Sequence, residues 1–338
     1  MTLVAKCRAV TGVVILNYNG WRYTIDCILS LLELEEQIRI IVIDNQSSDG
    51  SEHEITSWMR TDLELLNAER TRHGRPKARF QKSQFGKATT DIDDGTLKIN
   101  LIQAGRNGGY AAGNNIGIQF ALDHDCDFIW LLNNDTIVER EALKWLIVRV
   151  KENLQIGLCG SKLVYYDRPD VVQALGGARF RAWRGWSETL GLGSSRDQEI
   201  NSVDIEAQLS FVNGASTLVT RAFIEKIGLM SEEYFLYWEE IDWAFRARGL
   251  FKLGFAPLSV VRHRVGASIG TSDFGVQSLL ADFYMLRNQI RFAVKFSWRS
   301  LPVTYYRACR GILRSIINGD RPRARVLLRA ILCKSFQS

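Results

Sequence analysis

The sequence predicts an α/β protein in which helices flank a mainly parallel sheet, followed by a smaller mixed β region and a basic helical C-terminal tail. Two observations support this prediction. Short runs rich in valine and isoleucine alternate with amphipathic stretches through the first half of the chain, and strands that alternate with helices form parallel sheets through right-handed crossovers. The 338 residues are 46 % apolar and 24 % charged, with 5 prolines, which excludes a disordered, collagen-like or disulfide-stapled chain.

Four strands and four helices are predicted in the first half of the chain. Buried strands are indicated by the apolar runs at residues 11–16, 39–43, 99–103 and 128–132. Helices are indicated by apolar residues at helical spacing in residues 21–34, 111–122 and 139–150, and by a start signal at Ser51. Glu54 follows three residues after Ser51, a spacing typical of a capping box.

The remaining segments differ in composition. Residues 67–98 are basic and polar, so we expect a solvent-exposed insertion between a helix and a strand, either flexible or folded on a partner. Residues 156–214 contain short strands and Gly, Arg and Trp loops, typical of mixed, partly antiparallel structure. Helical periodicity returns after Arg287, and we expect a main domain over residues 1–284 and a tail over residues 285–338.

Charge is distributed unevenly along the chain. Residues 285–338 contain 12 Lys and Arg against one acidic residue, Asp320, so the tail carries +11 and residues 1–284 carry −5 of the formal net charge of +6. No recognised nucleic-acid motif accompanies the basic tail, and we expect no nucleic-acid partner. Apolar residues lie between the basic ones, which favours docking on an anionic membrane surface; the alternative is a solvated basic helical cap.

Cellular location is predicted from features that the sequence lacks. The N-terminus has no apolar run and cleavage site of a secretory signal, and no run approaches the ~18 apolar residues of a membrane-spanning helix. We therefore expect a cytoplasmic protein, peripheral on the inner face of the cell membrane. Without a Cys-X-X-Cys pair, buried reduced thiols are expected for the six cysteines, Cys7, Cys27, Cys126, Cys159, Cys309 and Cys333.

Polar residues follow all four predicted strands. They are Asn17-Tyr18-Asn19, Asp44, Asn107-Gly108-Gly109 and Asn133-Asn134-Asp135. Each group alone is also ordinary turn chemistry. Ligands bind beyond the carboxyl ends of parallel strands, so the four groups together favour a polar ligand such as a nucleotide. The first strand is not followed by a Gly-X-Gly-X-X-Gly fingerprint, which disfavours a Rossmann dehydrogenase.

The chemistry of these side chains suggests their roles. Asp44 can accept hydrogen bonds from a base or ribose, and Gly108 and Gly109 allow close approach of the backbone to a ligand. Asn114 lies near the N-terminus of the next helix, where anions are favoured. Asp135 is a hard oxygen ligand suited to Mg²⁺ or Mn²⁺, and such ions take one or two carboxylates together with substrate phosphates.

A later segment contains three carboxylates within four positions, Glu239, Glu240 and Asp242, after an aromatic run. One interpretation is an acidic first helical turn in which Asp242 pairs with Arg246. The other is that one carboxylate, its pKa raised beside aromatic surface, acts as a general base. His263 lies in a predicted strand before a glycine turn, where it is either structural or a metal ligand.

These motifs, in this order, resemble the inverting glycosyltransferases of family 2, which have the GT-A fold, and in particular their rhamnosyltransferase-like branch. The matching segments are VVILNYNG, IIVIDNQSSDGS, AGRNGGYAAGNNIGI, WLLNNDTIV, FVNGASTLVTRAFIEKIGLM, FLYWEEIDWAFRARG and VVRHRVGAS, which span residues 11–270. The resemblance implies transfer of a sugar from a nucleotide-diphosphate sugar such as dTDP-rhamnose. The acceptor would be a hydroxyl of a glycan or lipid-linked saccharide in bacterial surface polysaccharide synthesis.

The resemblance also implies roles for the residues at the strand ends. Asp135, with Asn133 and Asn134, stands where the family has its D-x-D motif, so Asp135 would bind a Mg²⁺ or Mn²⁺ that bridges the donor diphosphate. His263 stands where some relatives complete that metal site. The base, ribose and sugar of the donor would be held by Leu16, Asn17, Tyr18, Asn19, Asp44, Asn107, Gly109, Asn114, Asn133 and Asn134.

Glu239 and Glu240 stand at the family's acidic pair, usually Glu-Asp, whose second member is the catalytic base; here that residue is Glu240. Trp238 would stack on a sugar of the acceptor. The sequence departs from the wider family in two places: Asn133 replaces an acid, and Glu240 is one methylene longer than Asp. Two other functions stay open, a metal-dependent nucleotidyltransferase and a non-catalytic nucleotide-sugar or polysaccharide-binding protein.

Overall fold

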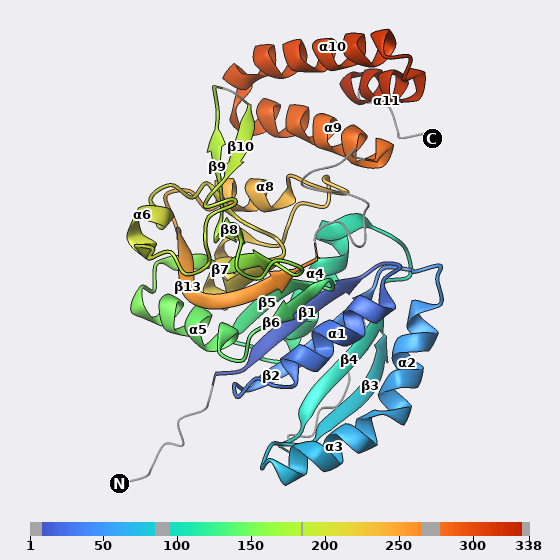
Figure 1. Cartoon of the computed structure of the whole chain (residues 1–338), viewed down its shortest axis with the longest axis vertical. Helices are drawn as coiled ribbons and strands as arrows, with labels where there is room; N and C mark the ends of the chain where they lie inside the picture. Colours follow the sequence, from blue (N-terminus) through green and yellow to red (C-terminus); the bar gives the residue numbers. More distant parts are fainter. Residues whose placement is uncertain (1–8, 85–94, 184, 265–277, 333–338) are drawn as a thin grey trace.

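A ten-stranded sheet forms the centre of the structure (Figure 1). The structure is a computed structural model that describes residues 9–84, 95–183, 185–264 and 278–332. The strand order is β3-β4-β2-β1-β5-β12-β7-β13-β6, and β8 also pairs with β7. The strands are β1 (Thr11–Asn17), β2 (Ile38–Asp44), β3 (Ala78–Gln84), β4 (Leu97–Gln103), β5 (Phe128–Asn133), β6 (Thr136–Val138), β7 (Ile156–Tyr165), β8 (Val172–Leu175), β12 (Ser216–Thr220) and β13 (Lys252–His263).

The strands from β3 to β5 in this order are all parallel, whereas β12 is antiparallel to both of its neighbours. The parallel register places Asn17 beside Asp44 and Leu16 beside Asn133. The carboxyl ends of β1, β2 and β5 therefore meet at one edge of the sheet, as the sequence predicts. A second, antiparallel sheet confirms the mixed β region; it contains β10 (Trp186–Thr189), β9 (Gly177–Arg181) and β11 (Phe211–Val212).

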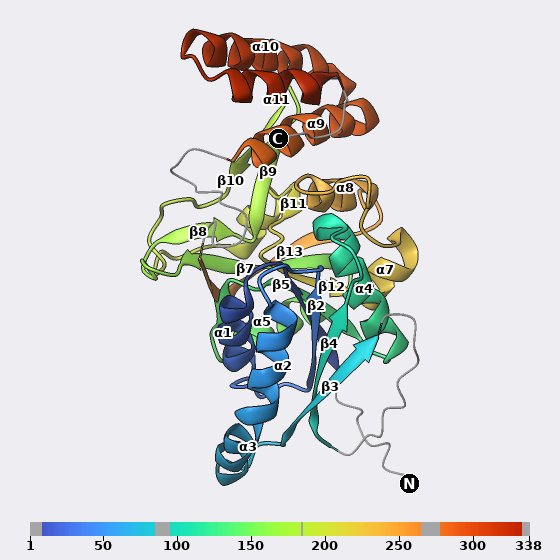
Figure 2. The same ribbon diagram turned by 90° about the vertical axis from the view of Figure 1, so that its right-hand side faces the viewer.

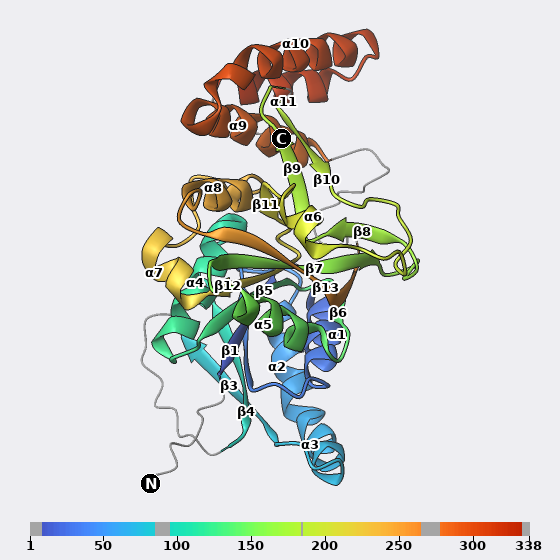
Figure 3. The same cartoon turned by 90° about the vertical axis from the view of Figure 1, so that its left-hand side faces the viewer.

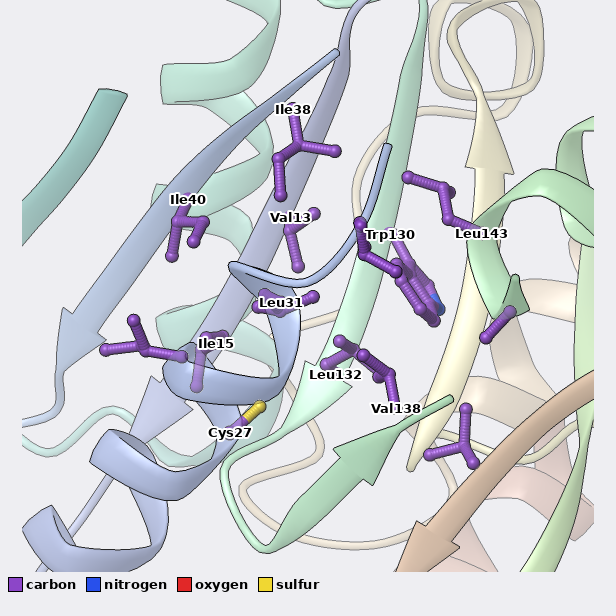
Figure 4. Packing of buried hydrophobic residues seen from close by; sticks show 14 of the residues in the cluster. Val13, Ile15, Cys27, Leu31, Ile38, Ile40, Trp130, Leu132, Val138 and Leu143 are labelled. Atoms are coloured by element: carbon purple, nitrogen blue, oxygen red, sulfur yellow. The ribbon is translucent and has the colours of Figure 1, made fainter. Parts of the chain in front are cut away.

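Helices cover both faces of the main sheet, because alternate residues of a strand point to opposite sides. Val13 and Ile15 of β1 enter one core, whereas Val14 enters the other. Figure 4 shows the first core, which includes the buried side chains of Leu31 and Trp130. The helices of this part are α1 (Trp21–Leu31), α2 (Ser51–Thr61), α3 (Leu63–Arg72), α4 (Gly109–Asp123), α5 (Ala142–Glu152), α6 (Ser202–Glu206), α7 (Arg221–Ile227) and α8 (Glu239–Arg246).

Helix α4 crosses β1 closely because glycines lie at the contact. A Cβ atom on Gly113 would lie 2.3 Å from the side chain of Leu16, and one on Gly117 would lie 2.3 Å from that of Val14. Such distances are far below van der Waals contact, so neither position has room for a side chain. This close packing fixes the N-terminus of α4 beside the carboxyl end of β1.

The predicted strands and helices of the first half are confirmed, with small shifts at their ends, but the capping box is wrong. Gly50, in the left-handed conformation with φ 81°, is the N-cap of α2. Ser51 lies inside the first turn and donates its hydroxyl hydrogen to Asp49 Oδ1 at 2.5 Å. Asp49 accepts hydrogen bonds from both the backbone and the side chain of Ser51. The Ser51 hydroxyl therefore bonds to the residue before the N-cap and does not cap the helix.

The segment 67–98 is more ordered than the sequence suggests. It contains the end of α3 and all of β3, which pairs in parallel with β4 and forms an edge of the main sheet. The described part of this segment is therefore folded on the protein's own sheet, not on a partner. An edge strand pairs on one side only, so its sequence can be as polar as that of β3. Residues 85–94 lie outside the described residues.

Three helices follow β13 in the described chain and stack at one end of the molecule (Figures 2 and 3). They are α9 (Leu279–Phe296), α10 (Leu301–Ile317) and α11 (Arg321–Ile331), with a short 3-10 helix, η1 (Trp298–Ser300), before α10. Phe292 of α9 packs with Phe180 and Phe245 of the main body, whereas Phe283 packs with Val326 of α11. The boundary that we expected after residue 284 thus lies inside α9. No helix among the described residues is both long and apolar enough to cross a bilayer.

The cysteine prediction is partly confirmed. Cys27, Cys126 and Cys159 are buried free thiols, but Cys309 is exposed on α10. Burial raises the pKa of Cys27 to about 12 and that of Cys126 to about 11, so both stay protonated at neutral pH. Cys7 and Cys333 lie outside the described residues.

Candidate functional site

Asp44 lies at the meeting point of β1 and β2 with its carboxylate already held in place. Asn17 Nδ2 donates to Asp44 Oδ1 at 2.8 Å, and Ser47 donates to the two carboxylate oxygens from its hydroxyl at 2.5 Å and its backbone N–H at 3.2 Å. Asp44 and Asn17 are both buried. The sequence predicts both as ligands of the nucleotide; the structure shows that Asn17 holds Asp44, and that Ser47, which we did not predict, completes this arrangement.

Asn134 ties the end of β5 to the end of β1. Its buried side-chain amide lies 3.1 Å from Thr24 Oγ1, 3.2 Å from the Gly20 carbonyl and 3.3 Å from Asn17 Oδ1. The amide therefore supports the strand ends, and we assign it a positioning role in place of the predicted contact with the nucleotide-sugar. Asn133, its neighbour, is partly exposed at the end of β5.

The loop after β1 is fastened to the loop after β2. Asn19 has a left-handed backbone with φ 53°, and its side-chain oxygen accepts the backbone N–H of Ser48 at 2.7 Å. Its own N–H donates to Ser47 Oγ at 2.9 Å. The side chain of Asn19 thus closes the loop, whereas the ring of Tyr18 is 38 % exposed and accessible to a ligand. Leu16 packs on α4 at Gly113.

The turn before α4 is held by a residue that sequence reasoning missed. Asn45, which directly follows Asp44, donates its side-chain amide to Asn107 Oδ1 at 3.0 Å and to the Gly109 carbonyl at 3.2 Å. Asn114 is buried and donates to the Tyr110 carbonyl one turn earlier in α4. Asn45 could have been predicted as a site residue because it directly follows the end of β2.

Asp135 and His263 are brought together by pairing of β6 with β13, which sets Thr136 beside His263. Nε2 of His263 lies 3.2 Å from Oδ1 of Asp135, and both side chains are largely buried. No described residue makes a hydrogen bond to that Oδ1 atom. In the described part of the chain, no group of three or more His, Cys, Asp or Glu could hold a metal.

The acidic segment is held in a strained backbone conformation. Tyr237 and Trp238 have φ values of 66° and 77°, which cost of order 1–3 kcal/mol each for residues with side chains. Two helices hold the preceding turn: the backbone N–H of Tyr110 donates to the Phe235 carbonyl at 2.8 Å, and the buried Asn288 of α9 donates to the Leu236 and Tyr237 carbonyls at 2.8 and 3.1 Å. These hydrogen bonds stabilise the strained backbone directly before α8, and so they fix the position of Glu239 and Glu240 in its first turn.

Glu239 and Glu240 interact as a pair at the first turn of α8. Burial raises the pKa of Glu239 well above its ordinary value, and the charge of Glu240 raises it further. Burial also raises the pKa of Glu240, whereas its hydrogen bond with Glu239 lowers it. Glu239 is buried and Glu240 is partly buried, and two adjacent carboxyls with little access to water do not both ionise easily.

Tyr110 and Gly214 form the surroundings of Glu240. The Tyr110 hydroxyl donates to the Gly214 carbonyl at 2.8 Å, and a Cβ on Gly214 would lie only 2.2 Å from Glu240 Oε1. Burial raises the pKa of Tyr110, and the charges of Glu240, Glu239 and Asp135 raise it further. The charges of the acidic pair and of Asp135 all act on this tyrosine, which the sequence did not indicate as a site residue.

Asp242 and Trp238 have structural surroundings. Asp242 is completely buried and accepts from Arg246 Nε and Lys295 Nζ, both at 2.8 Å, and from the Tyr234 hydroxyl. The ion pair with Arg246 is the alternative that the sequence left open, and it replaces a catalytic role for Asp242. Trp238 is partly buried and packs on Phe292 with ring centroids 5.2 Å apart, so part of its ring belongs to the aromatic core, and its contact with an acceptor stays a prediction.

Part of this chain is similar in sequence to known proteins. The first is low-salt glycan biosynthesis hexosyltransferase Agl10 of Haloferax volcanii, 25 % identical over 156 residues. The second is dTDP-rhamnosyl transferase RfbF of Shigella flexneri, 24 % identical over 149 residues. Each match covers 44 % of this chain and 46 % of the relative, so the chain spans less than half the length of either.

A solved structure agrees with the architecture over nearly the whole chain. Mannosyltransferase PcManGT from Pyrobaculum calidifontis, in complex with GDP-Man and Mn²⁺, superposes with a TM-score of 0.52 at 11 % identity, covering 97 % of this chain and 75 % of that one. The likeness confirms the expected GT-A fold. Residues 12–187, more than half of the chain, match the model for glycosyl transferase family 2. The chain belongs to glycosyl transferase family 2.

Proposed function

We propose that the protein transfers a sugar from a nucleotide-diphosphate sugar to a hydroxyl of a saccharide acceptor, with inversion at the anomeric carbon. The observation that carries this proposal is the position of Glu240 against Gly214, whose carbonyl accepts the Tyr110 hydroxyl at 2.8 Å. The charges of Glu240 and Asp135 both raise the pKa of that tyrosine. A base for the acceptor and a ligand for the donor diphosphate must lie close together, because their substrates react with each other.

Glu240 is the proposed general base. As the acceptor oxygen bonds to the anomeric carbon, its proton passes to the Glu240 carboxylate, and the bond to the departing nucleoside diphosphate breaks. One such displacement inverts the anomeric centre without a covalent intermediate. Burial raises the pKa of Glu240, which makes it a stronger base than an exposed glutamate. Protonated Glu239 beside it leaves a single negative charge on the pair.

Asp135 and His263 fit a divalent cation such as Mg²⁺ or Mn²⁺. The support is an orphaned, buried carboxylate oxygen, Asp135 Oδ1, with an imidazole nitrogen 3.2 Å away. An oxygen and a nitrogen ligand suit Mn²⁺. When bound, the cation would neutralise charge on the leaving diphosphate. With Asn133 in place of an acid, the protein itself brings one negative charge to this site.

We further propose dTDP-rhamnose as the donor and a glycan or lipid-linked saccharide in surface polysaccharide synthesis as the acceptor. This rests on the names of the similar proteins, one a dTDP-rhamnosyl transferase and one a glycan biosynthesis hexosyltransferase. The test is release of nucleoside diphosphate from dTDP-, UDP- and GDP-sugars in Mn²⁺. Binding of a donor without turnover of any would favour a non-catalytic binding protein instead.

An exposed apolar face on α10 supports the proposed location, peripheral on the inner face of the cell membrane. The residues that α10 buries are small or polar, Thr304, Ala308 and Ser315. Several of its large apolar residues are exposed, with exposed fractions of 65 % for Tyr306, 58 % for Leu313, 56 % for Ile316 and 74 % for Ile317. A helix on the surface of a soluble protein normally shows the reverse pattern.

Charge favours an anionic bilayer as the occupant of this α10 face. Arg307, Arg310 and Arg314 are exposed along one side of the apolar stripe, and α10 contains no acidic residue. Arginines near an anionic leaflet contribute about 1 kcal/mol each. A second copy of the chain on the same face would bring like charges together, which disfavours self-association.

Vesicle sedimentation tests the α10 face. We expect the protein to bind phosphatidylglycerol vesicles at low salt, and a Leu313→Glu/Ile317→Glu variant to lose that binding. Leu154→Glu, a change at a residue 83 % exposed elsewhere on the body, is the control and should bind normally. Equal binding of the double variant, or a wild-type dimer that this variant dissociates, would contradict the membrane assignment.

A further inference from the structure

Both ring nitrogens of His263 face a polar side chain. Its Nδ1 atom lies 2.9 Å from Oε1 of Gln173, and its Nε2 atom lies 3.2 Å from Oδ1 of Asp135. All three side chains are largely buried. The contact with Asp135 was expected from the sequence, but the contact with Gln173 was not, because the two residues are 90 positions apart.

The Gln173 contact fixes which nitrogen carries the proton. An amide oxygen can only accept a hydrogen bond, so Nδ1 must be the donor. A neutral imidazole has one N–H, and Nε2 therefore presents a lone pair toward Asp135. Asp135 Oδ1 has no hydrogen-bond donor among the described residues. Two electron-rich atoms thus face each other across 3.2 Å, an arrangement that a cation between them would stabilise.

A local irregularity of β8 places Gln173 in this position. In the pairing of β8 with β7, Ala174 lies opposite Leu163 and Val172 lies opposite Val164, so the register shifts and Gln173 has no opposite residue. It is the extra residue of a β-bulge. Bulges redirect side chains and occur often beside functional sites. Here the extra residue is Gln173, whose side chain contacts His263.

We propose that Gln173 is a positioning residue that holds His263 as the Nδ1–H tautomer and so prepares the Asp135–His263 pair for a divalent cation. The proposal rests on the metal site of the proposed function and deepens it. Partners of this kind behind a histidine ligand typically change metal affinity 10- to 100-fold when they are removed. Gln173 is not expected to touch substrate.

The tautomer can be measured without metal, donor or acceptor. The chain contains four histidines, so long-range ¹⁵N–¹H spectra of protein labelled at histidine are simple, and His263→Ala assigns the signal at pH 8. We expect Nδ1–H in the wild type and in Gln173→Glu, because a carboxylate also accepts. Gln173→Leu should lose this preference. If the wild type carries Nε2–H, the proposal is wrong whatever the enzyme's activity.

Mn²⁺ binding gives the second readout. Electron paramagnetic resonance of free Mn²⁺ should show binding weakened about 10- to 100-fold in Gln173→Leu and unchanged in Gln173→Glu. Gln208→Leu, at an exposed glutamine of the same region, is the matched control, and thermal unfolding checks that each variant is folded. Wild-type Mn²⁺ affinity in folded Gln173→Leu would overturn the proposal, and so would a loss in Gln173→Glu equal to that in Gln173→Leu. Either result would leave sugar transfer by Glu240 standing.

Discussion

Replacing Glu240 by glutamine isolates proton transfer from binding. The amide has nearly the size of the carboxylate, so it fits the space beside Gly214, where even an added Cβ would lie 2.2 Å from Glu240 Oε1. The amide cannot take up the proton of the acceptor hydroxyl. Loss of a general base costs roughly 10²- to 10⁴-fold in rate, equivalent to about 2.7–5.4 kcal/mol of transition-state stabilisation. We expect kcat to fall at least about 10²-fold, with the donor's Kd unchanged.

Glu239→Gln is the matched control for this experiment. Glu239 is 2 % exposed and already protonated in the proposed pair, and a glutamine imitates that neutral state. This variant should therefore keep most of its turnover, although the two residues are adjacent. The assay is the initial rate of nucleoside diphosphate release in Mn²⁺, with calorimetric titration of the donor. Near-wild-type turnover of Glu240→Gln, or equal losses in both variants, would refute the assignment of the base.

Three further outcomes are expected. Because burial raises the pKa of Glu240 above the ordinary value of 4.5 and the ionised form is active, kcat/KM should fall as pH drops through this raised pKa; an acidic limb at or below 4.5 would contradict this. Asp135→Asn should weaken Mn²⁺ binding in calorimetry, at least about tenfold, because Asp135 is the proposed charged ligand among the described residues; unchanged binding would remove Asp135 from the site. Asn288→Ala leaves two backbone carbonyls without their donor and should lower the free energy of unfolding in urea by about 1–3 kcal/mol, whereas the exposed Asn318→Ala should change it by less than about 0.5 kcal/mol. Equal effects of these two would show that Asn288 does not hold the acidic segment.

The parallel part of the sheet could be predicted because its signals are local. Strands β1, β2 and β5 are apolar runs, and polar residues mark the end of each. Asp44 and Asp135, which stand at the ends of β2 and β5, could therefore be placed on one edge of the sheet from sequence alone. Strand β3 was missed because an edge strand with the sequence ARFQKSQ lacks the apolar run of a buried strand.

The role of single polar residues could not be predicted where their partners are distant in sequence. Asp242 had two interpretations, and one of the contacts that decides between them comes from Lys295, 53 residues later. Gln173 lies in a β-bulge, and the residues next to it in the sequence do not predict that bulge. Apolar periodicity in α10 predicts a stripe but not its direction; close packing of Ala308 against the other C-terminal helices turns the stripe outward.

The most direct test of sugar transfer is nucleoside diphosphate release from a panel of dTDP-, UDP- and GDP-sugars in Mn²⁺, measured side by side for the wild type, Glu240→Gln and Asp135→Asn. We expect the wild type to turn over at least one donor, dTDP-rhamnose first among them, and both variants to release little. Binding of a donor by the wild type with no release from any member of the panel, or release that persists undiminished in both variants, would contradict the account.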